Sequence, residues 1–391
     1  MFSCFHVFMF SFHVFAFVMQ MMQSKFRVIF HEKMSSLDTV RDALLIARYE
    51  KIIDDVDFAL LYEANLSRLV YPYNKFDRFE IDTWDDSECR TDLGFGKQDL
   101  DLLRTYLQIP DEIVCSQRSV CEGMEGLCIL LKRLAYPCRY TDMVPRFGRN
   151  PTELCLIFNE VLDLVYANHS HRLQNWDLNP FLQPDQLHRY AEAIHLQGAP
   201  LTNCFGFIDG TVRSIARPKH NQRVMYNGHK RVHGIKFQSV VTPNGLIANL
   251  SGPFEGKRHD STMLHESGLL NDLRRVAFHN GQPLCLYGDP AYPLGVHLQA
   301  PFKGNNLTPH MELYNKSMSE VRVAVEMLFG NISNYFKFID FKRQMKVNLS
   351  PLGKIYFVCA LLENAQTCLY GNQVSHMFGI DPPSLNDYFS W

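Results

Sequence analysis

The hydrophobic pattern of the chain changes its period near Pro200. Before this point apolar residues recur at helical spacing, from Leu37 to about Tyr71 and again over residues 123–168. After it, short apolar runs have the length and alternation of β-strands. The expected strands cover residues 205–209, 233–242, 246–250 and 284–289, and the expected helices cover residues 259–276, 317–336 and 351–369. This order predicts an α/β fold, in which a mixed sheet is flanked by helices.

The segment before the sheet is predicted to be all-α. A helix over 126–135 and a short one over 140–147 precede Asn150-Pro151, an N-cap followed by proline at the first helical position, which opens a longer helix. This layout is typical of a helix-turn-helix, and an ordinary helical bundle fits the pattern equally well. The acidic residues 75–101 predict a solvated connection, leading into a helix near Asp99–Leu107.

The same pattern divides the chain into five regions. They are a Phe-rich leader (1–33), a helical and acidic region (34–118), a helical, helix-turn-helix-like domain (119–200), the α/β domain (201–372) and a frayed tail (373–391). Residues 1–23 contain no Asp, Glu, Lys or Arg and are long enough to span a bilayer, but they lack the basic region and cleavage site of a secretory signal. We interpret Met34 as the start of the working protein and expect no stable membrane association; a membrane-anchored protein is the alternative. The 11 cysteines form no Cys-x-x-Cys pair, which favours a reducing compartment.

Four acidic residues stand at the boundaries of the predicted elements. Asp209 and Asp289 each end an apolar strand, and Asp260 begins a helix. Glu326 lies between apolar residues on a helix, with Gly330 one turn further on. Clustered carboxylates repel one another unless a cation is present, and Mg²⁺ and Mn²⁺ prefer such oxygen ligands. The four acids therefore predict a divalent-metal site.

Each acid also has a purely structural interpretation. Asp209 and Asp289 are common turn residues, and Asp260 is a common helix N-cap. Glu326 is spaced to form an ion pair with Arg322 in the preceding turn. Each structural role is favoured when an acid is considered alone. The combination of two strand-end aspartates with an apolar-flanked glutamate favours the site.

Basic residues cluster in the same half of the chain. The formal net charge is −2, but residues 207–260 hold nine Lys or Arg against three acids, interleaved with four histidines. We expect Lys219, Arg223, Lys230 and Arg231 to bind the phosphates of DNA. A solvated hairpin face is the alternative.

These residues resemble the DDE transposases of the PIF/Harbinger type and their domesticated relatives. The matching stretches are Phe207-Ile208-Asp209-Gly210-Thr211, His259-Asp260-Ser261, Tyr287-Gly288-Asp289-Pro290-Ala291-Tyr292-Pro293-Leu294 and Arg322-Val323-Ala324-Val325-Glu326-Met327-Leu328-Phe329-Gly330. Their order and separations also fit, over roughly residues 120–370. One departure is Pro290-Ala291, where the family more often has Ser-Gly.

The resemblance implies a ribonuclease H-like catalytic domain that cuts and joins DNA with Mg²⁺ or Mn²⁺. Asp209, Asp289 and Glu326 match the catalytic triad of the family, and Asp260 matches a further metal ligand. The resemblance also implies a nuclear protein, and some family members rely on a Myb-like partner; a homo-oligomer is compatible with it. The function expected is therefore a metal-dependent DNA endonuclease, and the alternative is a domesticated, non-cutting DNA- or protein-binding module.

Overall fold

The computed structural model describes residues 44–64 and 73–391, which fall into two units, residues 1–72 and 73–391. In the first unit residues 44–49 and α3 (Asp55–Ala64) are helical. The single helical pattern expected here is interrupted at residues 50–54, where Lys51 has a left-handed φ of 52°. Leu60 of α3 is 63% exposed. The Phe-rich leader lies outside the described residues, and none of the described helices is long and apolar enough to cross a membrane.

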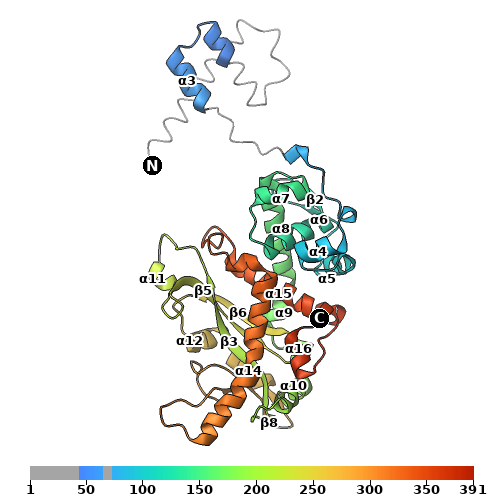
Figure 1. Ribbon diagram of the computed structural model, residues 1–391, viewed down its shortest axis with the longest axis vertical. Coiled ribbons are helices and arrows are strands. Elements are labelled where there is room, and N and C mark those ends of the chain that lie inside the picture. The colour runs from blue at the N-terminus through green and yellow to red at the C-terminus, as the bar shows by residue number, and fades with distance from the viewer. Residues whose placement is uncertain (1–43, 65–72) are drawn as a thin grey trace. The chain divides into compact units, whose positions relative to one another are not determined.

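The second unit is built on a mixed sheet of six strands (Figure 1). Its strands are β3 (Cys204–Ser214), β4 (Tyr226–Asn227), β5 (Val232–Val241), β6 (Ile247–Glu255), β9 (Cys285–Tyr287) and β10 (Leu298–Gln299). The order is β10-β9-β3-β5-β4, with β6 also paired to β5. The pairs β3–β5, β4–β5 and β5–β6 are antiparallel, whereas β3–β9 and β9–β10 are parallel. The α/β class predicted from the sequence is therefore confirmed.

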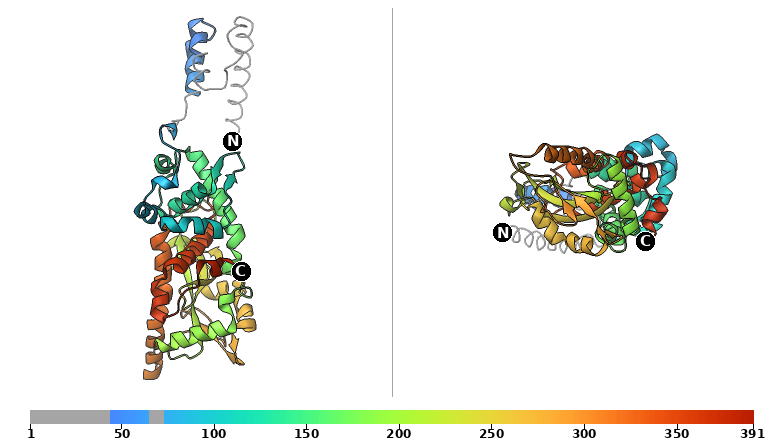
Figure 2. Two further views of the ribbon diagram at one scale, coloured as in Figure 1. Left: turned by 90° about the vertical axis from the view of Figure 1, so that its right-hand side faces the viewer. Right: turned by 90° about the horizontal axis from the view of Figure 1, so that it is seen from below.

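Helices cover both faces of this sheet (Figure 2). One face packs on α10 (Pro184–Leu196), α12 (Asp260–Ser267) and α13 (Leu269–Val276), through a cluster that includes Phe205 and Ile208 of β3. The other packs on α14 (Pro309–Tyr335) and α15 (Leu352–Tyr370), through a cluster that includes Phe207 of β3 and Phe237 of β5. Because alternate strand residues point to opposite faces, both faces of the central strands are apolar and buried.

Several elements differ from their predicted form. The strand β6 and the helix α14 are longer than expected, and β9 ends at Tyr287, two residues before Asp289. The strand expected to end at Asp209 continues to Ser214, because residues 211–214 include two β-branched side chains and pair with β5. Asp209 therefore lies inside β3, opposite Ser239. The helix expected over 259–276 is two helices, since Gly268 takes a left-handed φ of 72° between them.

The three helices predicted over 123–168 are confirmed. They are α6 (Gly123–Ala135), α7 (Tyr140–Phe147) and α8 (Pro151–His169), and Asn150 caps α8 with a side-chain bond to the amide of Thr152. The other short elements of the second unit include β1 (Glu112–Val114), β2 (Val120–Glu122), α9 (His171–Gln174), η4 (Pro180–Leu182), α11 (Gln222–Met225), β7 (Phe278–His279), β8 (Gln282–Pro283) and η5 (Lys337–Asp340). Inside this region the carboxylate of buried Glu125 accepts hydrogen bonds from both Nε and Nη2 of buried Arg149, at 2.5 and 2.7 Å.

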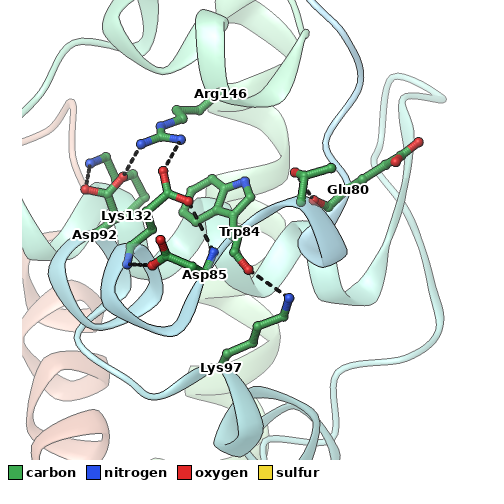
Figure 3. A network of polar contacts seen from close by, with 9 residues as sticks. Glu80, Trp84, Asp85, Asp92, Lys97, Lys132 and Arg146 are labelled. Atoms are coloured by element: carbon green, nitrogen blue, oxygen red, sulfur yellow. Dashed lines mark hydrogen bonds and ion pairs between the residues drawn. The ribbon is translucent and has the colours of Figure 1, made fainter.

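The acidic segment 75–101 was expected to be a solvated connection, and this prediction is wrong. The segment forms η1 (Tyr73–Lys75), η2 (Ile81–Thr83), α4 (Asp86–Leu93) and η3 (Lys97–Asp99), followed by α5 (Leu100–Tyr106) where a helix was expected. Two of its acids pair with cations from α6 and α7 (Figure 3): Asp92 with Lys132 at 2.8 Å and with Arg146 at 3.6 Å, and Glu88 with Arg146 at 3.1 Å. The Arg146 guanidinium also lies 4.8 Å from the ring centre of buried Trp84.

The last residues were expected to be frayed, and they are folded instead. They form α16 (Gln373–Phe378) and α17 (Leu385–Phe389), with Tyr388 and Phe389 buried. Buried Arg172 donates hydrogen bonds to the carbonyls of Tyr388 and Phe389, at 2.9 and 2.7 Å. These carbonyls close a helix end and need donors, which explains why a charged side chain is buried there.

We expect Arg149→Met to lower the free energy of unfolding by about 3–5 kcal/mol, because it leaves the Glu125 carboxylate buried without its partner. Adding Glu125→Leu should recover most of this loss, since no unpaired charge then remains. Urea denaturation of both proteins measures the difference. Equal stability of the single and double variants would contradict a role for the unpaired charge.

Candidate active site

The pairing of β3 with β9 brings two of the predicted acids together. These strands are parallel, and Phe207 is level with Tyr287. Asp209 and Asp289 follow these two residues at the same distance, two positions further along each chain. Neighbouring strands lie about 4.8 Å apart, so the two aspartates come close to one another. Asp209 shares a face with Phe207, the side covered by α14, whereas Asp289 lies in the turn that follows β9.

The third acid, Asp260, reaches the same edge from the opposite face. It is the first residue of α12, and its carboxylate lies against Gly210, where a Cβ would come within 2.6 Å of Oδ1. Only glycine at position 210 leaves room for this carboxylate beside Asp209. Lys236 of β5, itself buried, donates to Asp260 Oδ1 at 2.5 Å and to the carbonyl of Arg258 at 3.0 Å.

The surroundings of Asp209 disfavour the ionised form of its carboxyl group. Burial raises its pKa from 3.8 to about 6, Arg322 of α14 opposes this shift, and Asp289 and Asp260 add to it. Arg322 Nη2 lies 3.2 Å from Asp209 Oδ1. Because Asp289 and Asp260 both act on Asp209, we group the three as the acid cluster: Asp209, Asp260 and Asp289.

Tyr292, three residues after Asp289, is buried near the acid cluster. Its ring is buried against Gly288, and its hydroxyl has no hydrogen-bond partner among the described residues. Burial raises the pKa of Tyr292 well above its ordinary value, and the charges of Asp260, Asp209 and Asp289 raise it further. A buried hydroxyl without a partner next to three carboxylates marks a position where a polar group would be stabilised.

The structure does not bring Glu326 into this cluster. Glu326 is exposed on α14, one turn of about 5.4 Å beyond Arg322 and on the same side of the helix. A Cβ at Gly330 would meet no atom within 4 Å, because this stripe of α14 is open. Glu326 is thus one helical turn from Arg322, and no contact joins it to the acid cluster in the described part of the chain.

The purely structural roles considered for these acids, as turn residue, N-cap or ion-pair partner, are found at Asp289 but, among the described residues, not at Asp260 or Glu326. Asp289 does form a turn, since its Oδ1 accepts from the amide of Ala291 at 2.9 Å. Asp260 is not the N-cap of α12, because His259 occupies that position. In the described part of the chain no ion pair joins Glu326 to Arg322, which contacts Asp209 instead.

Two cations of the site were not identified from the sequence in these roles. Arg322 was considered only as a partner of Glu326, and Lys236 only as one of many basic residues. The signal for Lys236 was its position in β5, where it alternates with inward-facing Ile235 and Phe237 and so must lie on the other buried face. A lysine buried in this way needs a carboxylate partner.

The four basic residues predicted to bind phosphate lie in the connection between β3 and β5, apart from the acid cluster in sequence. Lys219 is in a bend, Arg223 is in α11, and Lys230 and Arg231 form the turn before β5. All four side chains are exposed, and none has an ion pair in the described residues. Lys257, also exposed, joins them, because its amide donates to the carbonyl of Val224 in α11.

The donor set suits a hard divalent cation. The acid cluster supplies only oxygen ligands. Burial raises the pKa of Asp209, Arg322 opposes this shift, and Asp289 and Asp260 add to it, so a cation beside these acids would favour the ionised form of Asp209. In the described residues, however, no group of three or more His, Cys, Asp or Glu is already arranged to hold a metal. Each carboxylate of the cluster is instead engaged by Arg322, Lys236 or a turn amide.

Comparison with known proteins supports a nuclease site. A family model described as DDE superfamily endonuclease matches residues 208–364. This segment contains Asp209, Asp260, Asp289 and Glu326. Neither the curated proteins nor the solved structures yield a match. The family match indicates a transposase-type nuclease domain in this part of the chain.

We expect stability without metal to fall as the pH rises from about 4 to 6. Over this window the folded protein retains the Asp209 proton that the unfolded chain has released, so the folded state loses up to about 3 kcal/mol relative to the unfolded state. Asp209→Asn should abolish this fall, whereas Glu320→Gln on the exposed side of α14 should not. Urea denaturation at pH 4 and pH 7 in chelator measures it. An unchanged fall in Asp209→Asn would show that Asp209 is not the group responsible.

Proposed function

We propose that this protein is a divalent-metal-dependent DNA endonuclease of the Harbinger transposase type, with Asp209, Asp289 and Glu326 as its catalytic residues. The observation that carries the proposal is the position of Asp209 and Asp289, two residues beyond paired positions on parallel strands, inside a segment that matches a DDE endonuclease family. Two carboxylates placed in this way by adjacent strands are suited to share a cation.

The topology supports a ribonuclease H-like fold for the catalytic domain. Three antiparallel strands, β3, β5 and β6, come first along the chain, and β9 and β10 then add in parallel on the other side of β3. The first strand of the domain is therefore central and carries the first acid. For the preceding region, the order of α6, α7 and α8 supports a helix-turn-helix-like unit.

Asp209, Asp260, Asp289 and Glu326 would hold the Mg²⁺ or Mn²⁺ ions. The chemistry that two bound ions supply is activation of the attacking water and stabilisation of the leaving oxygen of the phosphodiester. The chain itself prepares the site. Arg322 keeps Asp209 ionised, and Lys236 fixes the position of Asp260. Glu326, which is exposed on α14, would have to turn toward the acid cluster.

The exposed basic residues support DNA as the substrate. Lys219, Arg223, Lys230 and Arg231 present cations that have no carboxylate partner within residues 44–64 and 73–391, as required for contact with phosphates. We place the protein in the nucleus on the family resemblance alone, which also raises a Myb-like partner and a homo-oligomer as hypotheses.

We expect Asp289→Asn to reduce nicking of supercoiled DNA by about a hundredfold or more, because it removes one charged ligand from the site. DNA binding in chelator should be unchanged, since the basic residues remain. Mn²⁺ should raise the melting temperature of the unaltered protein and have little effect on the variant.

Asp381→Asn is the matched control, because Asp381 is an exposed aspartate that also precedes a proline. It should leave both nicking and the Mn²⁺ effect unchanged. Undiminished nicking by Asp289→Asn would overturn the role of this residue. DNA binding without any metal-dependent nicking by the unaltered protein would identify a non-cutting module instead.

We expect the double change Lys230→Ala and Arg231→Ala to weaken binding to all DNA sequences alike. The slope of log affinity against log salt should become shallower by about 0.9 for each phosphate that the variant no longer binds. Lys303→Ala with Lys316→Ala removes the same charge from exposed positions outside this stretch. Fluorescence anisotropy over a salt series measures the slopes. A changed sequence preference at an unchanged slope would contradict binding to phosphates.

A further inference from the structure

A cleft lies away from the acid cluster, where the helical region meets the segment between α14 and α15. Arg133 of α6, Tyr140 of α7 and Phe158 of α8 line one side, and Arg343, Lys346 and Ser350 line the other. Its volume of about 320 Å³ is in the range of small-molecule sites, about 300–1,000 Å³. The start of α15 packs beside α8 at this point (Figure 1).

The cleft contains a buried cation without a counterion. Arg133 is only 7% exposed, and its Nε and Nη1 have no hydrogen-bond partner among the described residues. The guanidinium lies between two rings, 4.4 Å from the centre of Tyr140 and 4.8 Å from that of Phe338. These cation–π contacts offset part of the cost of burial, but among the described residues they leave Nε and Nη1 without hydrogen-bond acceptors.

The surroundings of Arg133 favour an anion. Arg343 and Lys346 add two exposed cations, and neither has an ion pair in the described part of the chain. None of the described lining residues is an Asp or a Glu. The nearest acid along this segment, Asp340, is engaged by Arg213 at 3.1 Å. Three positive charges therefore border one cleft without a negative charge to balance them.

The segment that carries these cations is fixed to the helical region. The Gln344 side chain donates to the carbonyls of Pro137 and Cys138, both at 3.5 Å, and Ser350 Oγ donates to the Gln344 carbonyl at 3.2 Å. Arg343 and Lys346 flank this anchored glutamine. The cleft is thus a formed feature of the fold, and an anion within it would bridge the helical region to the segment leading into α15.

We propose that this cleft binds a phosphate group, with Arg133 as its buried anchor and Arg343 and Lys346 at its opening. A guanidinium presents N–H groups in a planar fork that matches two oxygens of one phosphate, and such charge-assisted hydrogen bonds are the strong ones. The phosphate comes either from a free phosphate or phosphorylated small molecule, or from the backbone of the DNA that the proposed function supplies. Only the second source rests on that function.

Titration of the full chain with inorganic phosphate, in chelator and at constant ionic strength set with chloride, tests the site. We expect phosphate to raise the melting temperature and to bind measurably by calorimetry. The double change Arg343→Ala and Lys346→Ala should weaken phosphate binding by at least about tenfold, because each charge-assisted hydrogen bond is worth about one such factor. Lys342→Ala is the matched control, since Lys342 is an exposed neighbour that does not line the cleft.

A third variant tests the anchor. Arg133→Met retains the apolar length of the side chain and its packing against the two rings, and it should abolish phosphate binding while the protein remains folded by circular dichroism. If it does not fold, the Arg343 and Lys346 double variant decides the matter. The double change Lys230→Ala and Arg231→Ala should leave phosphate affinity unchanged, which separates this cleft from the basic stretch near β5.

DNA binding by the same variants distinguishes the two sources. If the cleft binds a backbone phosphate of DNA, Arg343→Ala with Lys346→Ala should weaken DNA binding and make its salt slope shallower. If it binds free phosphate or a phosphorylated small molecule, DNA binding should be unchanged while phosphate binding falls. Either result supports the site and is independent of whether the protein cuts DNA. The proposed phosphate site would be overturned if Arg133→Met and the Arg343→Ala with Lys346→Ala variant bound phosphate and DNA as tightly as Lys342→Ala does.

Discussion

Three carboxylates at one edge of a sheet can be stable together only if positive charge lies close to them. In this protein the neutralising charges come from the chain itself, as Arg322 beside Asp209 and Lys236 beside Asp260. They come from α14, which covers one face of the sheet, and from β5 within it, so the electrostatic balance of the acid cluster depends on the complete fold. Burial raises the pKa of Asp209 in spite of Arg322, and Asp289 and Asp260 raise it further, so additional positive charge would stabilise the ionised acid cluster.

A cation-binding site must retain some negative charge that the cations of the chain itself do not neutralise. If the arginine and lysine neutralised the acids fully, a metal would gain little by entering. If they were absent, mutual repulsion of the carboxylates would oppose folding. Arg322 lies one turn from Glu326 on the same side of α14, so the cation that contacts Asp209 and the glutamate of the proposed site belong to one side of this helix.

The remainder of the chain uses the same principle in a structural role. The acids of α4 are bound by Lys132 and Arg146, Glu125 is bound by Arg149, and Arg172 satisfies the carbonyls at the end of α17. Arg133 is the exception, since it is buried with rings around it and no acid. The contrast between Arg133 and these satisfied arginines is the reason for assigning it a ligand.

Local and periodic features of this protein could be predicted without its structure, whereas features that depend on distant partners could not. Alternation defined β5, capping at Asn150-Pro151 defined the start of α8, and apolar runs followed by aspartate identified Asp209 and Asp289 as candidates. These signals are short-range, because propensity, capping and strand alternation act over a few residues. The pattern also indicated that the two aspartates would meet, since parallel strands carry their ends to one edge.

The distant partners became known from the folded chain. Pairing with β5 extended β3 through Asp209, cations from α6 and α7 hold the acidic segment against the helices, and Arg172 fixes the C-terminal residues. The fold likewise sets Arg322 against Asp209 rather than Glu326, and Lys236 against Asp260. Ion pairs between segments far apart in sequence have no periodic signature, because the partner of a charge is set by the packing of whole elements.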